Sequence, residues 1–245
     1  SAGLNRANGP FYDAMALAAI DYDAICLGNH DFDFGPGLLA DFINDVNSMN
    51  PTPYLSANLD MSTEPALAGL ASNGDIASST IVNKGGEMIG VVGATTPQLS
   101  NISSPGQITI NTDVVNAVQG EINNLLGQGV DKIILISHLQ GVGEDTALIA
   151  NLSGVDIAIA GGGDELLGDS TTLLVPGDGP NFYGSYPLTK TDAQGRTVYI
   201  VTTPGEYKYV GQLNVTFDAA GEVSSIDAGS GLYRVANENH TDGVA

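Results

Sequence analysis

The residues of this chain best suited to catalysis lie in one short run, Asn29-His30-Asp31. An amide oxygen, an imidazole and a carboxylate can ligate a divalent cation or transfer a proton. They follow residues 22–27, a brief apolar run that predicts a buried β-strand. Ligands of open α/β sheets bind just beyond the carboxyl ends of strands. Both the position and the chemistry of these three residues therefore indicate a functional site.

Two further apolar runs end in polar residues. Residues 132–136 lead into Ser137-His138, and residues 155–160 lead through three glycines into Asp164-Glu165. Neighbouring parallel strands present their carboxyl ends at one edge, so we expect these side chains to converge on Asn29. A single histidine at a strand end usually forms only hydrogen bonds, but two of the three histidines here occupy such positions. Imidazole with amide or carboxylate oxygens favours zinc, manganese or iron.

Alternating helices and strands between residues 10 and 160 predict an α/β fold with a largely parallel sheet and helices on its faces. Residues 60–78 are expected to be irregular. After residue 197, an antiparallel meander is expected from three β runs, at 198–203, 207–217 and 223–228. No linker separates the halves, so we expect one domain over residues 1–234 and a polar tail at 235–245.

The composition argues against some partners. Twenty-eight acidic and seven basic residues give a net charge of −21, whereas nucleic acids and anionic membrane surfaces bind through lysines and arginines. No apolar run approaches the ~18 residues of a membrane-spanning helix, so we expect no membrane insertion. The acidic charge fits an exported protein, a saline habitat or cation binding. The single cysteine, Cys26, lies in the first predicted strand and is expected to be a core residue.

Residues 28–35, Gly-Asn-His-Asp-Phe-Asp-Phe-Gly, resemble the third signature block of the calcineurin-like metallophosphoesterases. The form is that of the 5′-nucleotidase / 2′,3′-cyclic phosphodiesterase branch. Further runs resemble that branch in the same order, namely Leu55-Ser56-Ala57-Asn58, residues 90–97, Ile136-Ser137-His138 and residues 205–211. The ordered series spans residues 10–228 and is more specific than any one run.

The resemblance implies a four-layer α/β/β/α sandwich of mostly parallel strands, followed by the antiparallel C-terminal meander. It implies hydrolysis of a phosphomonoester, with a nucleoside 5′-phosphate or a cyclic nucleotide as the expected substrate. Two divalent ions (Mn, Zn or Fe), about 3.5–4 Å apart, would activate water and stabilise charge. Because the family is usually exported, we expect a periplasmic, extracellular or cell-surface location.

The resemblance also assigns roles to individual residues. It implies that Asn29 and His138 ligate one of the two metals. His30 would polarise the phosphoryl group or protonate the leaving oxygen. Asp31 would orient the ring of His30, so that the two residues form a catalytic dyad.

The chain departs from the family in its last block, Gly-His-x-His or Gly-His-x-Gln. Here the block is Gly162-Gly163-Asp164-Glu165, so Gly163 replaces the first ligand. Glu165 can still reach a metal as a carboxylate, and Asp164 can shift to fill the gap. A one-residue change of register would set Gly162 and Asp164 at the ligand positions, and a glycine replaces the first ligand in either case.

The first two blocks of the family, Asp-x-His and a Gly-Asp whose aspartate bridges both metals, have no counterpart in residues 1–22. Two explanations compete. In the first, the chain is part of a longer enzyme whose N-terminal segment brings the bridging aspartate and half of the ligands. The larger nucleotidases also carry a separate C-terminal domain that stacks on the base. In the second, the chain has lost the metals and serves as an extracellular binding or structural protein. We expect the chain by itself to be inactive, because nothing in it replaces the bridging carboxylate.

Overall fold

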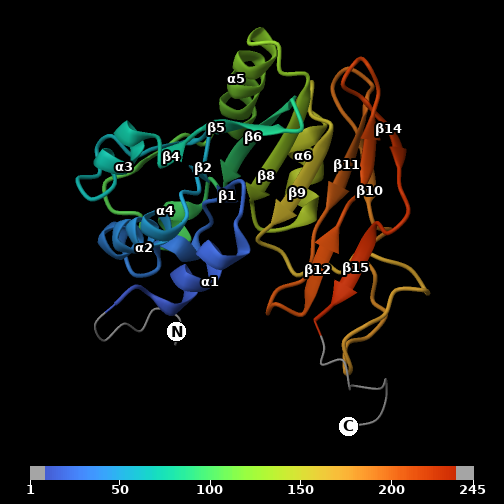
Figure 1. Ribbon diagram of the computed structural model, residues 1–245, viewed down its shortest axis with the longest axis horizontal. Coiled ribbons are helices and arrows are strands. Elements are labelled where there is room, and N and C mark those ends of the chain that lie inside the picture. Colours follow the sequence, from blue (N-terminus) through green and yellow to red (C-terminus); the bar gives the residue numbers. More distant parts are fainter. Residues whose placement is uncertain (1–8, 236–245) are drawn as a thin grey trace.

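The largest element of the structure is a six-stranded sheet with the strand order β10-β11-β9-β8-β6-β5 (Figure 1). The four inner strands run parallel, and each edge strand pairs antiparallel with its neighbour. The strands are β5 (Ser79–Lys84), β6 (Glu87–Thr95), β8 (Lys132–His138), β9 (Ile157–Gly161), β10 (Leu188–Thr191) and β11 (Thr197–Val201). The computed structural model describes residues 9–235.

A smaller parallel sheet packs against the first. Its strands, in spatial order, are β1 (Ile25–Cys26), β2 (Tyr54–Leu55) and β4 (Ile76–Ala77). Leu55 of this sheet is buried together with Val91 and Ile136 of the larger sheet. β2 and β6 approach so closely that a side-chain carbon at Gly93 would overlap the carbonyl group of Leu55. The two sheets therefore meet at a point where only a glycine fits.

Helices α5 (Val114–Gly127) and α6 (Val142–Ile149) pack on the six-stranded sheet. The buried side chains of α5 include Val118, Ile122 and Leu125, whose spacing of three to four residues places them on one helix face. They join residues of β6, β8, β9 and β11 in the largest hydrophobic cluster of the described chain. This cluster fixes the strands that carry the predicted site.

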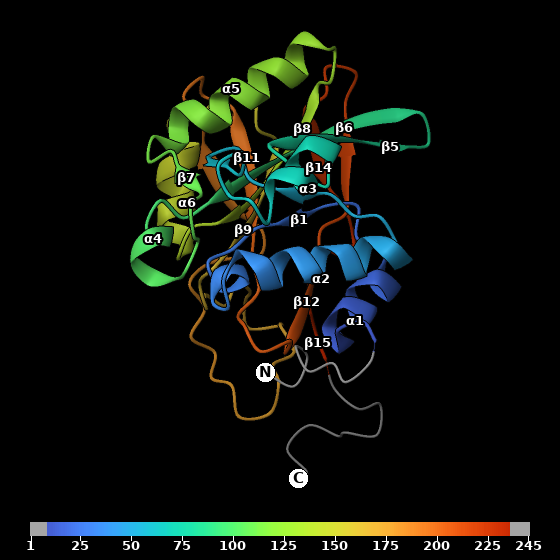
Figure 2. The ribbon, with the colours of Figure 1, turned by 90° about the vertical axis from the view of Figure 1, so that its left-hand side faces the viewer.

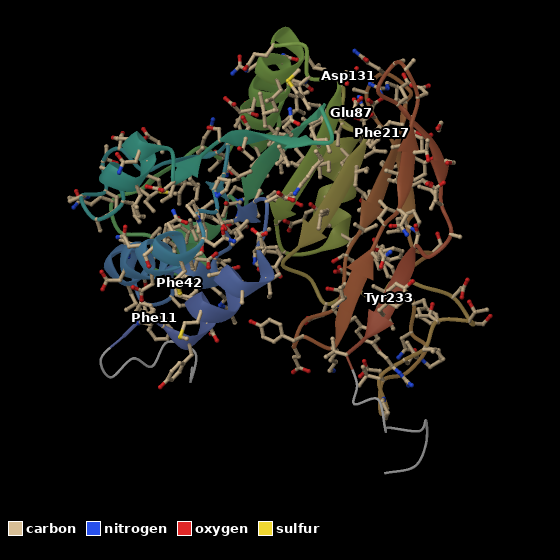
Figure 3. The ribbon with its side chains drawn as sticks, viewed as in Figure 1. Phe11, Phe42, Glu87, Asp131, Phe217 and Tyr233 are labelled. Atoms are coloured by element: carbon tan, nitrogen blue, oxygen red, sulfur yellow. The ribbon has the colours of Figure 1, made fainter. Side chains whose placement is uncertain are left out.

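Helices α1 (Tyr12–Ile20) and α2 (Pro36–Met49) lie beside each other next to the small sheet (Figure 2). α2 begins with a proline, which is favourable in the first helical turn. Ile43 of α2 is buried in the same cluster as residues of the small sheet. The rings of Phe11 and Phe42, 5.8 Å apart, join the two helices (Figure 3).

The remaining elements are short. They are η2 (His30–Phe32), β3 (Leu59–Asp60), α3 (Ala68–Asn73), α4 (Leu99–Ile102), β7 (Thr109–Ile110), β12 (Tyr209–Gln212), β13 (Val215–Phe217), β14 (Val223–Ile226) and β15 (Gly231–Arg234). None of the helices over residues 9–235 has both the length and the hydropathy needed to cross a membrane.

The structure confirms a mixed α/β fold with a parallel-strand sheet. The expected C-terminal meander differs in its first strand, since β11 pairs parallel with β9 and buries Val198 and Ile200 in the main cluster. β13 and β14 form an antiparallel hairpin as expected, and β12 pairs with β15. Residues 60–78, expected to be irregular, contain α3 and β4, because Leu67 and Leu70 are buried. The predicted tail lies outside the described residues except for Val235.

The contact between the two sheets gives a first prediction. A Gly93→Ala substitution should lower the free energy of unfolding by about 1–3 kcal/mol, because its methyl group forces β2 away from β6. Gly120 of α5 is the matched control, since a side chain there meets open space, and Gly120→Ala should raise stability by about 0.5–1 kcal/mol. Urea unfolding followed by circular dichroism measures both. Equal changes in the free energy of unfolding for the two substitutions would refute the close approach of β2 to β6.

Candidate active site

Three strand ends meet at one edge of the two sheets. Asn29 follows β1, His138 ends β8, and Gly161 ends β9 beside it in register. Oδ1 of Asn29 lies 3.0 Å from Nε2 of His138, although 109 positions separate them in sequence. The side-chain amide of Gln140 donates to the same oxygen at 3.0 Å. Asn29, which is only 5% exposed, therefore joins the ends of both sheets.

Two glycines make room for the imidazole of His138. A side-chain carbon at Gly28 would lie 2.6 Å from Nδ1 of the ring, and one at Gly162 would lie 3.2 Å from Nε2. Gly162 also has a φ of 92°, which glycine adopts without steric cost. Burial lowers the pKa of His138, and the charge of nearby His30 lowers it further. A neutral ring is the form that can bind a metal.

A buried pair holds the strand residue that precedes His138. The hydroxyl of Ser137 donates to Oδ1 of Asp145, which lies in the first turn of α6 and is fully buried. Desolvation raises the pKa of the Asp145 carboxyl to about 7. Among the described residues the other oxygen of Asp145 has no hydrogen-bond partner. The pair ties α6 to the end of β8, so it positions His138 without touching it.

His30 is held by Asp33. Nδ1 of His30 lies 2.7 Å from Oδ2 of Asp33, and the other oxygen of Asp33 accepts a hydrogen bond from Ser103 at 2.8 Å. The bond to His30 is the main reason that the pKa of Asp33 is lowered. The side chain of His30 is 79% exposed, so its Nε2 is accessible from solvent.

Asp31 turns back toward the strand. Its Oδ2 accepts a hydrogen bond from the backbone N–H of Gly28 at 2.7 Å. Asp31, His30 and Asp33 all line a cavity of about 1180 Å³, so water reaches the carboxylate although protein surrounds it. Desolvation raises the pKa of Asp31 to about 6, opposed by the bond from Gly28. The structure thus places Asp33, and not Asp31, at the ring of His30.

Glu165 occupies the space beside Gly163. A side-chain carbon at Gly163 would overlap Oε2 of Glu165. The other oxygen of Glu165 accepts a hydrogen bond from the backbone N–H of Val142 at 3.2 Å, whereas Oε2 is buried and has no partner among the described residues. Asp164 is exposed and accepts a hydrogen bond from the N–H of Gly205 at 3.3 Å. Of the two acidic residues, Glu165 is therefore the one with a buried oxygen that lacks a partner among the described residues.

The donor set fits part of a metal site. Asn29 and His138 bring an amide oxygen and an imidazole nitrogen together, which is a suitable pair for a borderline divalent ion. The unpartnered oxygen of Glu165 is a further candidate, because a buried carboxylate oxygen is costly unless something pairs with it. Over residues 9–235, however, no group of three or more His, Cys, Asp or Glu side chains is placed to hold a metal.

The chain is similar in sequence to known 5′-nucleotidases. A 5′-nucleotidase of Diplobatis ommata is 37% identical over 216 residues, which cover 86% of this chain and 34% of the relative. A snake venom 5′-nucleotidase of Crotalus adamanteus is 35% identical over 213 residues, or 84% of this chain and 33% of the relative. No family model matches the sequence.

Solved structures show the same relationship. The 5′-nucleotidase precursor of Thermus thermophilus superimposes with a TM-score of 0.77 at 37% identity, covering 88% of this chain and 39% of that one. A calcineurin-like phosphoesterase of Bacillus subtilis shares the fold, with a TM-score of 0.62 at 20% identity over 92% of this chain and 67% of that one. The chain belongs to the calcineurin-like metallophosphoesterase superfamily. Its relatives confirm the 5′-nucleotidase branch, and it spans about a third of the length of the two curated relatives.

Some residues of this candidate site were not predictable from the motif alone. Gln140 shares the oxygen of Asn29, and its only signal in the sequence is its place two residues after His138. Asp145 holds Ser137 from the first turn of a predicted helix, where an acidic residue is ordinary. Asp33 belongs to the same motif run as His30, but the motif does not show that Asp33 holds the ring. The ligand and catalytic roles inferred from the resemblance stay predictions.

The hydrogen bonds of Asn29 give the second prediction. In EDTA, Asn29→Ala should lower the free energy of unfolding by about 1–3 kcal/mol, because His138 and Gln140 lose their buried acceptor. Asn123→Ala is the control, since Asn123 accepts one exposed bond on α5 and its loss should change stability by less than about 0.5 kcal/mol. If thermal or urea unfolding shows equal losses of stability for Asn29→Ala and Asn123→Ala, Asn29 does not join the two strand ends.

Proposed function

We propose that this chain carries part of the active site of a metal-dependent phosphomonoesterase that acts on nucleotides. The observation that carries the proposal is the 3.0 Å approach of Asn29 Oδ1 to His138 Nε2 at the shared edge of two stacked sheets. The 5′-nucleotidase names of the relatives support the substrate class. A nucleoside 5′-phosphate is the preferred substrate and a cyclic nucleotide the alternative.

Asn29 and His138 are the proposed ligands of one divalent ion, with Glu165 as a further candidate and Asp164 as a weaker one. Bound divalent ions supply Lewis acidity that polarises the phosphoryl group and lowers the pKa of water. Manganese, zinc and iron all suit these donors. Gly28 and Gly162 leave the space that the ring of His138 fills, and burial lowers the pKa of His138, which favours the neutral ring.

His30 is the proposed proton donor to the leaving oxygen. Asp33 holds Nδ1 of the ring, which leaves Nε2 free to face a substrate at the cavity mouth. Ser103 fixes the second oxygen of Asp33, so the carboxylate cannot turn away from the ring. The orienting role predicted for Asp31 falls more naturally to Asp33 in this geometry, while Asp31 stabilises the turn through Gly28.

An exported protein is the proposed setting, at the cell surface, in the periplasm or outside the cell. One relative is a venom protein and one structural neighbour is a precursor. The net charge of −21 fits such a setting. Nucleic acid is not a proposed partner.

A second candidate function rests on Gly163. The block that supplies two ligands in the family has a glycine there, and Glu165 fills the space of the missing side chain. If Glu165 cannot replace that ligand, the protein is a metal-depleted binding or structural member of the family. Metal content separates the two candidates, because only the first requires bound transition metal.

The third prediction separates the roles of the two histidines in the complete gene product. His138→Ala should lower affinity for Zn²⁺ or Mn²⁺ at least about tenfold, since even residues behind a ligand contribute about 10–100-fold. His30→Ala should leave metal affinity unchanged and lower kcat for nucleoside 5′-monophosphates by about 100-fold or more. Isothermal titration and phosphate release measure the two quantities.

Each histidine serves as the control for the other. Equal metal affinities of His138→Ala and the unmodified protein would refute the ligand role. Full activity of His30→Ala would refute its role as proton donor. An unmodified protein that holds no metal and releases no phosphate would favour the metal-depleted candidate.

A further inference from the structure

The carboxylate of Glu165 lies in space that two glycines leave for it. A side-chain carbon at Gly141 would lie 2.9 Å from Oε1 of Glu165, and one at Gly163 would overlap Oε2. The carboxylate therefore needs glycine at both positions. A carbon at Gly163 would also lie 2.9 Å from the backbone Cα of Gly141. In this loop conformation, position 163 has no room for a side chain that could bind a ligand.

One oxygen of this carboxylate is held and the other is not. Oε1 accepts a hydrogen bond from the backbone N–H of Val142, the first residue of α6, at 3.2 Å. No side chain of the helix caps this end, so a carboxylate is favourable there. Oε2 is buried and has no hydrogen-bond partner within residues 9–235. Buried carboxylates are normally paired, protonated or bound to a metal ion.

Asp145 has the other unpartnered carboxylate oxygen in the described part of the chain, and a proton can serve it. Its side chain is fully buried, and Ser137 donates to its second oxygen. Desolvation raises the pKa of Asp145 to about 7, and the negative charge of Glu165 contributes to that rise. A proton on Asp145 weakens its repulsion of Glu165. The oxygen of Glu165 is then the one left for a cation.

The loop that holds Glu165 also holds the pair of Asn29 and His138. Gln140, which directly precedes Gly141, donates to Oδ1 of Asn29 at 3.0 Å. The same oxygen lies 3.0 Å from Nε2 of His138. Residues 138–142 therefore run from the imidazole, past the residue that holds Asn29, to the N–H that holds Glu165. A carboxylate oxygen without a partner thus belongs to the same strand ends as the proposed ligand pair.

We infer that Glu165 gives its Oε2 to the ion held by Asn29 and His138, and that this carboxylate narrows the preference of the site for zinc over manganese. The inference rests on the proposed function, which leaves manganese, zinc and iron open. Carboxylate oxygens suit Mn²⁺, whereas imidazole nitrogens suit Zn²⁺. Zn²⁺ binds most sites of this kind more tightly than Mn²⁺. The ratio of the two dissociation constants is therefore the quantity that shows the effect of Glu165.

Metal titration of the complete gene product tests the inference. Isothermal titration gives the dissociation constants of Mn²⁺ and Zn²⁺ for the unmodified protein, Glu165→Gln and Glu165→His. Glu165→Gln should weaken Mn²⁺ binding at least about tenfold, since even residues behind a ligand contribute about 10–100-fold. Glu165→His should raise the ratio of the Mn²⁺ constant to the Zn²⁺ constant at least about tenfold, because imidazole replaces carboxylate.

Glu144→Gln is the matched control. Glu144 lies in the first turn of the same helix and is exposed, so this substitution removes the same charge from the same helix end. Because it does not touch the space between the two glycines, its metal constants should change by about twofold or less. Equal effects of Glu144→Gln and Glu165→Gln would mean that net charge alone acts, and the inference would be wrong.

The remaining outcomes separate this inference from the proposed function. If Glu165→Gln binds Mn²⁺ as tightly as the unmodified protein, or Glu165→His leaves the ratio unchanged, the inference is overturned while the roles of Asn29 and His138 stand. If Asp164→Asn weakens Mn²⁺ binding and Glu165→Gln does not, Asp164 is the ligand and the inference is again overturned. An unmodified protein that binds neither ion contradicts both the inference and the proposed function.

Discussion

The hydrogen bond between Asn29 and His138 is the constraint on which the rest of the site depends. It joins the end of β1 in the small sheet to the end of β8 in the large one, so it exists only while the two sheets stay stacked. The stacking in turn requires glycine at position 93. Gly28 and Gly162 then leave just the space that the imidazole fills. Buried apolar surface holds the sheets together, and the polar pair fixes their register.

Much of the site was predictable from the sequence because strand ends obey simple rules. Apolar runs that end near Asn29 and His138 predicted that these side chains would converge, and they do. The prediction of neighbouring strands in one sheet was wrong, since β1 and β8 belong to two stacked sheets. The partner of His30 was not predictable in the same way. In the 3₁₀ turn η2, residues three apart lie on one side, which puts Asp33 at the ring and turns Asp31 back to Gly28. The motif gives only the order of the residues, whereas the conformation of the turn decides which side chains are in contact.

The fold was predictable in class but less so in strand pairing. The run that contains Val198 and Ile200 has the same pattern in a parallel or an antiparallel strand, so sequence alone could not show that β11 joins β9. Sequence alone did not show α3 and β4 in the small-residue stretch at 60–78, because its large apolar residues, Met61, Leu67, Leu70 and Ile76, are few and widely spaced. Sequence alone also could not show that Ile159 of the inner strand β9 is 46% exposed, because the burial of a side chain depends on residues that are distant in sequence.

The central claim is that Asn29 and His138 form a preorganised part of a divalent metal site. Titration of the isotopically labelled chain with Mn²⁺ tests it most directly, because this paramagnetic ion broadens the NMR signals of nearby nuclei. The account predicts that the side-chain amide of Asn29 and the ring of His138 broaden at the lowest Mn²⁺ concentrations, before the exposed ring of His30 and the surface carboxylates. Sharp signals from Asn29 and His138, with broadening confined to the acidic surface, would contradict it.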